Sequence, residues 1–511
     1  MTDLFKQLKY DLPASIVVFF VAVPLCLGIA LASGAPLFAG LIAGVVGGIV
    51  VGGASGSPLG VSGPAAGLAV IVLGAIATLG GSWEAFLAAV VLAGVLQIAM
   101  GYAGLGGIAY YFPTSVIKGM LTGIGLLIII KQLPHALGTV PDPQDVVGVT
   151  GIEGGAIETL LASVTPAALF ITALSLALLV SWDAWLAPRF RIFRMVPGPL
   201  AAVALGILLG TLMGNGFLPW NLDAHQTVAI PVAESVQGFF AQFSRPDFSA
   251  FARGDVYTIA VLLAVIASIE TLLCVEATDR LDPQKRITPT DRELKAQGLG
   301  NIVSGLLGGL PVTQVIVRSS ANIAFGARTK LSAMLHGVLL LVCVAAIPGV
   351  LNLIPLATLA SILCVVGYKL AKPALFAAMY RHGWEQFTPF VATVAGILAT
   401  DLLRGIGIGL AVSVVIVLYH NLRNPFTFSQ HAPGTDMYRI RLAEEVSFLN
   451  KGRILQQLQL IPAQSHVVID ATESKTLDFD VHEILQDFCA GAPARNIAVE
   501  LRGITFNPAI R

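Results

Sequence analysis

Two ionisable side chains stand out because each lies in a segment apolar enough for a lipid bilayer. Glu270 belongs to the apolar run 256–275, and Arg318 follows a glycine-rich break at residues 305–311. An ionisable group inside a membrane is costly unless it is paired or faces a cavity, so such a group indicates a functional site. Opposite charges on neighbouring spans, one of them beside a broken helix, are typical of the centre of a secondary transporter.

A similar break occurs early in the chain. Residues 52–60 read GGASGSPLG and lead into VSGPAA at 61–66, while GGLP at 308–311 leads into VTQV at 312–315. Each break predicts a short extended approach followed by the start of a helix.

These helix starts have the chemistry of an anion site. We expect Pro64 in the first turn of one helix, with Ser62 or Gly63 as its cap, and Thr313 as the cap of the other helix. Two helix N-termini that face each other present unpaired N–H groups and the positive ends of two helix dipoles, which favours an anion carrier. The alternative is that the glycines only allow close helix packing.

The composition is that of a membrane protein. Of the 511 residues, 56% are hydrophobic and 12% are charged, whereas soluble domains carry about 25% charged residues. Basic and acidic residues balance, so no nucleic-acid partner is expected. The five cysteines have no CxxC spacing and are expected to pack as small apolar residues. The sequence has no Ser/His/Asp arrangement, metal cluster or phosphate loop, so we expect no enzyme, catalytic residue, metal or cofactor.

We expect an all-α polytopic membrane protein with about fourteen spans of about 20 apolar residues each. The expected spans are 12–31, 36–53, 60–79, 85–102, 114–134, 165–182, 197–214, 255–277, 292–307, 313–327, 330–348, 353–371, 386–402 and 404–421. They form two sets of seven, and an odd number per set inverts the second set relative to the first. The two broken segments then meet near the middle of the bilayer.

Basic residues set the expected orientation because Lys and Arg concentrate in cytoplasmic loops. One side carries Lys6, Lys9 and the bases of the loops at 189–194 and 280–286, while the long loops 135–164 and 215–254 on the other side carry few bases. We therefore expect a multi-pass protein with both termini in the cytoplasm.

Beyond residue 425 the pattern changes to that of a small α/β domain. Strands are expected at 437–442, 467–470 and 497–501, and helices at 450–460 and 481–490. The expected domains are a lead at 1–11, a membrane domain at 12–424 with repeats at about 12–214 and 255–421, and a linker and small domain at 425–511.

The chain resembles the SulP/SLC26 family of inorganic-anion transporters over nearly its whole length. The motifs that carry the resemblance are ETLLCVEATDR at 270–280, RELKAQG at 292–298, Gly300-Asn301, GGLP at 308–311, the segment from Asn322 to Lys330, and VSGPA at 61–65. The tail resembles a short STAS domain around the sequence VID at 468–470. Together with the entry LPVT at 310–313, this tail is similar to bacterial members that accompany carbonic anhydrases.

This resemblance implies a fold, an assembly and a site. The fold is a seven-plus-seven inverted repeat of the UraA and SLC26 type, with core and gate domains, elevator-like alternating access and a homodimer. The implied substrate-binding residues are Ser62, Gly63, Ala65, Ala66, Gln314, Val315, Ile316 and Arg318. Glu270 is implied to lie beside the anion as the ion-coupling group, and the STAS-like tail is implied to stabilise the dimer.

Departures from the family pattern bear on coupling. Many members have V-P-Q in the first span where this chain has VPL at 23–25, so a polar group near the site is absent. Sodium-coupled bicarbonate members use an Asp, Thr hydroxyls and a small residue, and the matching positions here hold Glu270, Cys274, Ile316 and Arg318. A hard cation needs several oxygen ligands, and a guanidinium would repel it, so sodium coupling is disfavoured.

Two interpretations of Glu270 stay open. In one, Glu270 takes up a proton during transport. In the other, it is a permanent ion-pair partner that holds Arg318 in place. We expect Glu276, Asp279 and Arg280 to form an ion network between core and gate or at the membrane surface, outside the substrate site.

The expected function is secondary active transport of a small inorganic anion across the bacterial inner membrane, coupled to protons or to exchange. Bicarbonate is the favoured substrate, ahead of sulfate, chloride and C4-dicarboxylates. The apolar Val315 and Ile316 leave few side-chain hydrogen-bond donors for the anion, which suits a small, singly charged one. The expected partners are the anion, membrane lipid and a second copy of the chain, with a functional link to carbonic anhydrase. An uncoupled anion channel or a regulatory scaffold is the alternative, and a nucleobase carrier is disfavoured by Arg318.

Overall fold

The computed structural model describes residues 7–107, 113–139, 164–189, 196–232, 236–400, 402–423, 426–430 and 437–504. Parts of the predicted lead 1–11 and of the loops 135–164 and 189–194 lie outside the described residues. The chain divides into two compact units, residues 1–410 and 411–511. The first unit is almost entirely helical, and the second contains an α/β fold.

The first half of the helical unit follows the predicted order of spans. Its elements are α2 (Leu8–Ala32), α3 (Leu37–Val46), the π-helix η1 (Gly47–Val51), α4 (Gly52–Ala54), β1 (Ser62–Pro64), α5 (Ala66–Thr78), α6 (Trp83–Tyr102), α7 (Thr114–Leu137), α9 (Pro166–Ser181), the π-helix η4 (Trp182–Leu186), α10 (Ala187–Arg189) and α12 (Gly198–Gly214).

The second half repeats this order after a connecting stretch with η5 (Ala224–Gln226), α13 (Val236–Ala241) and η6 (Phe248–Ala252). Its elements are α14 (Gly254–Leu281), α15 (Thr290–Leu306), β2 (Val312–Gln314), α16 (Ile316–Ala324), α17 (Leu331–Ala346), α18 (Pro348–Leu351), α19 (Leu356–Leu370), α20 (Pro373–Arg381), α21 (Trp384–Ala399) and α22 (Leu402–Arg423). Seven helices in the described ranges are long and apolar enough to cross a membrane, and shorter apolar helices accompany them. The predicted polytopic helical fold is confirmed.

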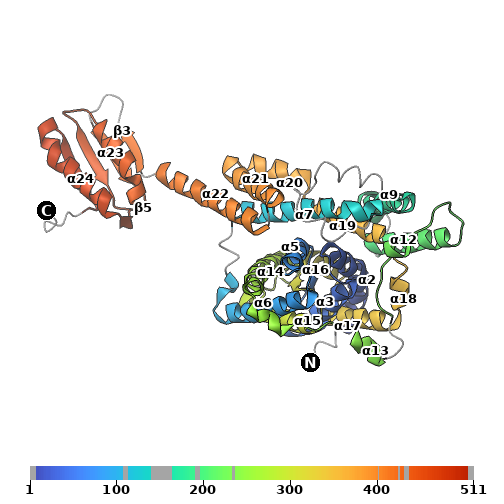
Figure 1. The fold of residues 1–511 in the computed structure, drawn as a ribbon. Helices are drawn as coiled ribbons and strands as arrows, with labels where there is room; N and C mark the ends of the chain where they lie inside the picture. The colour runs from blue at the N-terminus through green and yellow to red at the C-terminus, as the bar shows by residue number, and fades with distance from the viewer. Residues whose placement is uncertain are drawn as a thin grey trace. The chain divides into compact units, whose positions relative to one another are not determined.

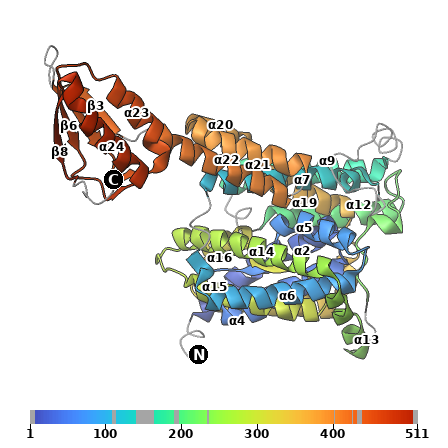
Figure 2. The same cartoon turned by 60° about the vertical axis from the view of Figure 1, so that its left-hand side comes forward.

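The helices of residues 1–410 form two groups (Figures 1 and 2). One group contains α7, α9, α12, α19, α20 and α21, and the other contains α2, α3, α5, α6 and α14 to α17. Helix α2 packs against α12 and α19, and α5 packs against α7, so these contacts join the two groups. The grouping places both broken helices, α5 and α16, in the same group.

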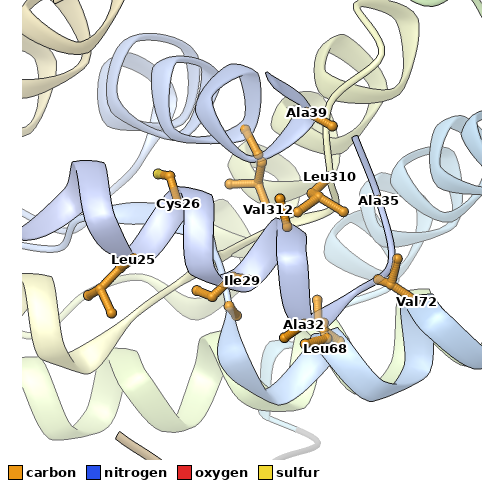
Figure 3. Close-up of a cluster of buried hydrophobic side chains, with 14 of the residues drawn as sticks. Leu25, Cys26, Ile29, Ala32, Ala35, Ala39, Leu68, Val72, Leu310 and Val312 are labelled. Atoms are coloured by element: carbon orange, nitrogen blue, oxygen red, sulfur yellow. The ribbon is translucent and has the colours of Figure 1, made fainter. Parts of the chain in front are cut away.

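Small and aliphatic side chains pack the middle of this second group. Ala32 of α2 lies beside Leu68 of α5 (Figure 3). Leu310, which precedes β2, and Val312, the first residue of β2, belong to the same cluster. Leu25 and Cys26 leave α2 in different directions in the same view. Close packing of this kind fixes where each neighbouring side chain points.

The two breaks meet as a short antiparallel ladder. Ser62 pairs with Gln314, Gly63 with Thr313, and Pro64 with Val312. The predicted caps are therefore wrong: Pro64 and Thr313 lie in strands, the helices begin only at Ala66 and Ile316, and their N-cap residues Ala65 and Val315 make no side-chain cap. Pairing between the strands satisfies backbone groups that the predicted caps would have served.

A polar stripe on α15 holds this ladder in place. Asn301 accepts a hydrogen bond from the Val312 N–H at 2.6 Å and donates to the Val312 carbonyl at 3.1 Å and to Gln97 at 2.6 Å. One turn away, Gln297 donates to the Ser62 hydroxyl at 2.8 Å and to Glu293 at 3.0 Å. The helical spacing of these residues puts them on one face, so a single helix positions both strands.

The α/β fold of the second unit agrees with the predicted strands and helices. Its main sheet has the order β3-β4-β6-β8, with β3 antiparallel to β4 and the other neighbours parallel. The elements are β3 (Phe426–Gln430), β4 (Met437–Leu442), β5 (Glu445–Val446), η7 (Phe448–Asn450), α23 (Lys451–Gln459), β6 (His466–Asp470), β7 (Thr476–Leu477), α24 (Phe479–Gly491), η8 (Ala492–Arg495) and β8 (Ala498–Arg502). Strand β3 and the β5-β7 pair were not expected from the sequence.

Replacing Asn301 with Ala is expected to destabilise the helical unit. The change leaves the buried N–H and carbonyl of Val312 without their side-chain partner, at a cost of roughly 1–3 kcal/mol for each unpaired group. Thermal unfolding of the detergent-solubilised protein should show a lower midpoint than wild type. Leu299→Ala on the exposed side of α15 is the control, and an equal loss in both variants would contradict this role for Asn301.

Candidate functional site

A cavity of about 200 Å³ lies where the broken helices meet their neighbours. Its walls come from α2, α5, α14 and α16 of one helix group and from α7 and α19 of the other. Most of the lining side chains are aliphatic. The cavity is therefore an apolar space with a small number of polar groups, as expected for a ligand site.

The starts of α5 and α16 both reach this cavity. Ala66 and Gly67 line it from α5, and Val315 and Ile316 line it from α16. Neither N-cap residue provides a side-chain hydrogen bond to the first N–H groups of its helix. Side chains of α14 approach these groups instead: Glu270 interacts with the N–H of Gly67, and Cys274 with the N–H of Ile316. The positive ends of two helix dipoles add to the attraction for an anion.

Among the residues that the structure describes, Glu270 on α14 is the only carboxylate that lines the cavity. Its carboxyl group interacts with the backbone N–H of Gly67, in the first turn of α5. The fit is close, because a Cβ at Gly67 would lie 2.6 Å from Oε1 of Glu270. The second oxygen, Oε2, is buried without a hydrogen-bond partner. A charged carboxylate held in this way is under-solvated, which makes its ionised form costly.

Arg318 lies in the first turns of α16 and is 1% exposed. Its Nη2 donates to Sγ of Cys26 on α2 at 3.3 Å. Its Nη1 has no hydrogen-bond partner and lies against Gly63, where a Cβ would collide with it. The guanidinium is thus a buried positive charge, without a carboxylate partner among the described residues, at the edge of the cavity.

The interpretation of Glu270 as a permanent ion-pair partner of Arg318 is wrong. The described residues contain no ion pair between them, and each side chain leaves one polar atom unpartnered. Glu270 turns to the N-terminus of α5, whereas Arg318 turns to α2 and to β1. The two groups share a cavity wall but point to different partners.

Five of the nine predicted site residues line the cavity, and four do not. The lining residues are Ala66, Val315, Ile316, Arg318 and Glu270, and those outside the lining are Ser62, Gly63, Ala65 and Gln314. Ser62 accepts from Gln297, and Gln314 donates to the Thr278 hydroxyl at 3.1 Å. These four residues precede the helix starts. The side chains of Ser62 and Gln314 form hydrogen bonds with α15 and α14.

Several lining residues were not in the predicted set. Pro64, Gly67 and Cys274 also line the cavity, and apolar side chains complete the lining: Leu25, Ile29, Met120, Leu121, Leu273, Ala277, Val317, Val366 and Leu370. Cys274 follows Glu270 by one helical turn, so the sequence contained a signal for it. The contributions from α7 and α19 have no local signal, because they depend on how distant helices pack.

The charged residues at the C-terminal end of α14 make contacts within that end of the helix and with the connector that follows it. Arg280 forms an ion pair with Glu276 one turn earlier, and Asp279 accepts from the N–H and hydroxyl of Thr288 in the connector. Burial works to raise the pKa of Asp282, but hydrogen bonds and the charge of Arg286 outweigh it and lower that pKa. These contacts link α14 to its own connector, where an ion network between core and gate or at the membrane surface was expected.

Comparison with known proteins identifies relatives over most of the chain. The sequence profile of the sulfate permease family matches residues 8–393. YvdB of Bacillus subtilis, named as a candidate sulfate transporter, is 28% identical over 446 residues, covering 85% of this chain and 80% of YvdB. The bicarbonate transporter BicA of Picosynechococcus is 27% identical over 421 residues, covering 81% of this chain and 71% of BicA.

Solved structures show the same fold. The transmembrane domain of a cyanobacterial bicarbonate transporter BicA superposes with a TM-score of 0.66 at 24% identity, covering 80% of this chain and 98% of that domain. Murine Slc26a9, an anion transporter solved in the inward-facing state, superposes with a TM-score of 0.76 at 16% identity, covering 98% of this chain and 86% of its own.

Gly67→Ala is expected to disrupt the site, because the new methyl group would displace the Glu270 carboxyl from the N-terminus of α5. Anion uptake into proteoliposomes should fall by about tenfold or more, as expected when a positioned group is moved by about 1 Å. Gly74→Ala on the same helix is the matched control, because a Cβ there has no neighbour within 4 Å. Equal uptake by the two variants would contradict the role given to the Gly67 contact.

Proposed function

The chain belongs to the sulfate permease family, whose members transport anions, and we propose that it carries bicarbonate by proton-coupled or exchange transport. The observation that supports this proposal is the cavity between two uncapped helix N-termini with Arg318 beside it. These groups supply positive potential without a bound metal ion. A small oxyanion would accept N–H bonds from both helix starts.

Bicarbonate fits the cavity better than sulfate does. Apart from Arg318, Glu270 and Cys274, the lining is apolar, so few side-chain donors are available to a doubly charged tetrahedral anion. Relatives named as bicarbonate transporters and relatives named for sulfate both match this chain. Sulfate, chloride and C4-dicarboxylates are the alternatives within the same site.

We assign coupling to Glu270. This carboxylate has one backbone N–H partner and one buried oxygen without a partner. Taking up a proton removes the free-energy cost of keeping its charge buried. Protonation would also remove a negative charge from the wall that receives the anion, so proton and anion would bind together. Cys274 and Arg318 offer no oxygen ligands beside Glu270, which argues against sodium.

Transport would move one helix group past the other. The cavity lies between the group that carries α5 and α16 and the helices α7 and α19, so a relative displacement would open it to either side. We propose elevator-like alternating access in a homodimer of the bacterial inner membrane, with cytoplasmic termini and a STAS-like tail that stabilises the dimer. A supply of bicarbonate from carbonic anhydrase would suit such a carrier. An uncoupled channel is the alternative, and it would not show saturating, countersubstrate-dependent flux.

Glu270→Gln is expected to remove proton coupling, because glutamine is permanently neutral and cannot take up or release a proton. In proteoliposomes, an inward proton gradient of one pH unit should raise the initial rate of radiolabelled bicarbonate uptake by up to about tenfold in wild type, because that is the change in proton activity. The variant should show no response to the gradient, and a sodium gradient should change neither protein.

Each arm of this experiment tests a separate assignment. Uptake that needs sodium would overturn the coupling argument based on Arg318 and Cys274. A proton response that persists in Glu270→Gln would remove Glu270 as the coupling group. Sulfate uptake in preference to bicarbonate would replace the substrate and leave the site intact.

A further inference from the structure

Helix α14 places two side chains, one helical turn apart, against the two helix starts. Glu270 interacts with the N–H of Gly67 at the start of α5, and the thiol of Cys274 interacts with the N–H of Ile316, the first residue of α16. Both side chains line the cavity. The two N-termini that would hold an anion are therefore each met by a group of the protein itself.

We propose that Cys274 is a specificity-determining residue that occupies the N-terminus of α16 in the empty site and is displaced by the anion. This inference rests on the proposed function, because it assumes that an anion binds at the two helix starts. It assigns the two α14 side chains different roles. Glu270 covers one helix start with a carboxyl group that can change its charge, and Cys274 covers the other with a neutral, weak acceptor.

The chemistry of the thiol suits such a displaceable cap. Sulfur is a weak hydrogen-bond acceptor, so an oxyanion competes with it readily for the Ile316 N–H. A stronger acceptor at this position would compete better with the anion, and a group without an acceptor would not compete. The residue at 274 would therefore set anion affinity without taking part in coupling.

A packing role alone does not account for the surroundings of Cys274. The same cavity wall includes the unpartnered Oε2 of Glu270 and the buried guanidinium of Arg318, whose Nη1 is also unpartnered. Cys274 thus lies among polar groups that have spare hydrogen-bonding capacity. Cys364 on α19, by contrast, is a membrane-helix cysteine outside the cavity lining.

The test compares Cys274→Val, wild type and Cys274→Ser in proteoliposomes with radiolabelled bicarbonate, and with sulfate in parallel. Valine is apolar, one heavy atom larger than cysteine and without an acceptor, and serine has a stronger acceptor than the thiol. The KM for uptake should increase from Val to Cys to Ser, by roughly twofold to fivefold per step, the range of small differences between neutral hydrogen bonds. The maximal rates should stay within about twofold, because the cap is displaced before transport.

Calorimetric binding of bicarbonate to the full-length, detergent-solubilised proteins should give dissociation constants in the same order. Cys364→Val is the control and should match wild type in both measurements. Equal constants for all three residues at 274 would overturn the inference. The reverse order would also overturn it, because it would mean that residue 274 donates a hydrogen bond to the bound anion. If the wild-type protein takes up neither anion, the proposed function is wrong, and this inference fails with it.

Discussion

The structure depends on one constraint, the need to satisfy backbone N–H and carbonyl groups inside a membrane. Two helices are broken in the middle of the helical unit, and a break of this kind is tolerated only where protein or a polar cavity takes up the exposed groups. The antiparallel pairing of β1 with β2 and the Asn301 contacts to Val312 satisfy most of them. The starts of α5 and α16 open onto the cavity, where Glu270 and Cys274 of α14 approach the N–H groups of Gly67 and Ile316.

The charges around this site have separate partners. Arg318 donates to Cys26 and lies against Gly63, and no carboxylate among the described residues neutralises its positive charge. Glu270 lies at the other helix start, where a negative charge has the helix dipole and one N–H to stabilise it. The wall of the cavity therefore carries a guanidinium without a carboxylate partner among the described residues and a carboxyl group that faces a different helix.

The sequence was sufficient to predict the helices and the breaks but not the contacts of the polar groups. Long apolar runs fixed the spans to within a few residues, and the Gly and Pro residues before Val61 and Val312 marked the breaks. The predicted caps were wrong because the residues before each helix pair as strands, which delays the helix starts to Ala66 and Ile316. Of the two interpretations of Glu270, the ion pair with Arg318 failed because the two side chains turn to different neighbouring elements, which the sequence does not specify. The walls from α7 and α19 depend on long-range packing, which no local pattern contains.

The most direct test of the account is the position of a bound anion. Crystals or crystal soaks with bromide, at a concentration that competes with bicarbonate uptake, would locate the ion by its anomalous scattering. The account predicts a peak in the cavity between the N–H groups of Gly67 and Ile316, beside Arg318. A peak elsewhere in the helical unit, with this cavity empty at a concentration that blocks uptake, would contradict it.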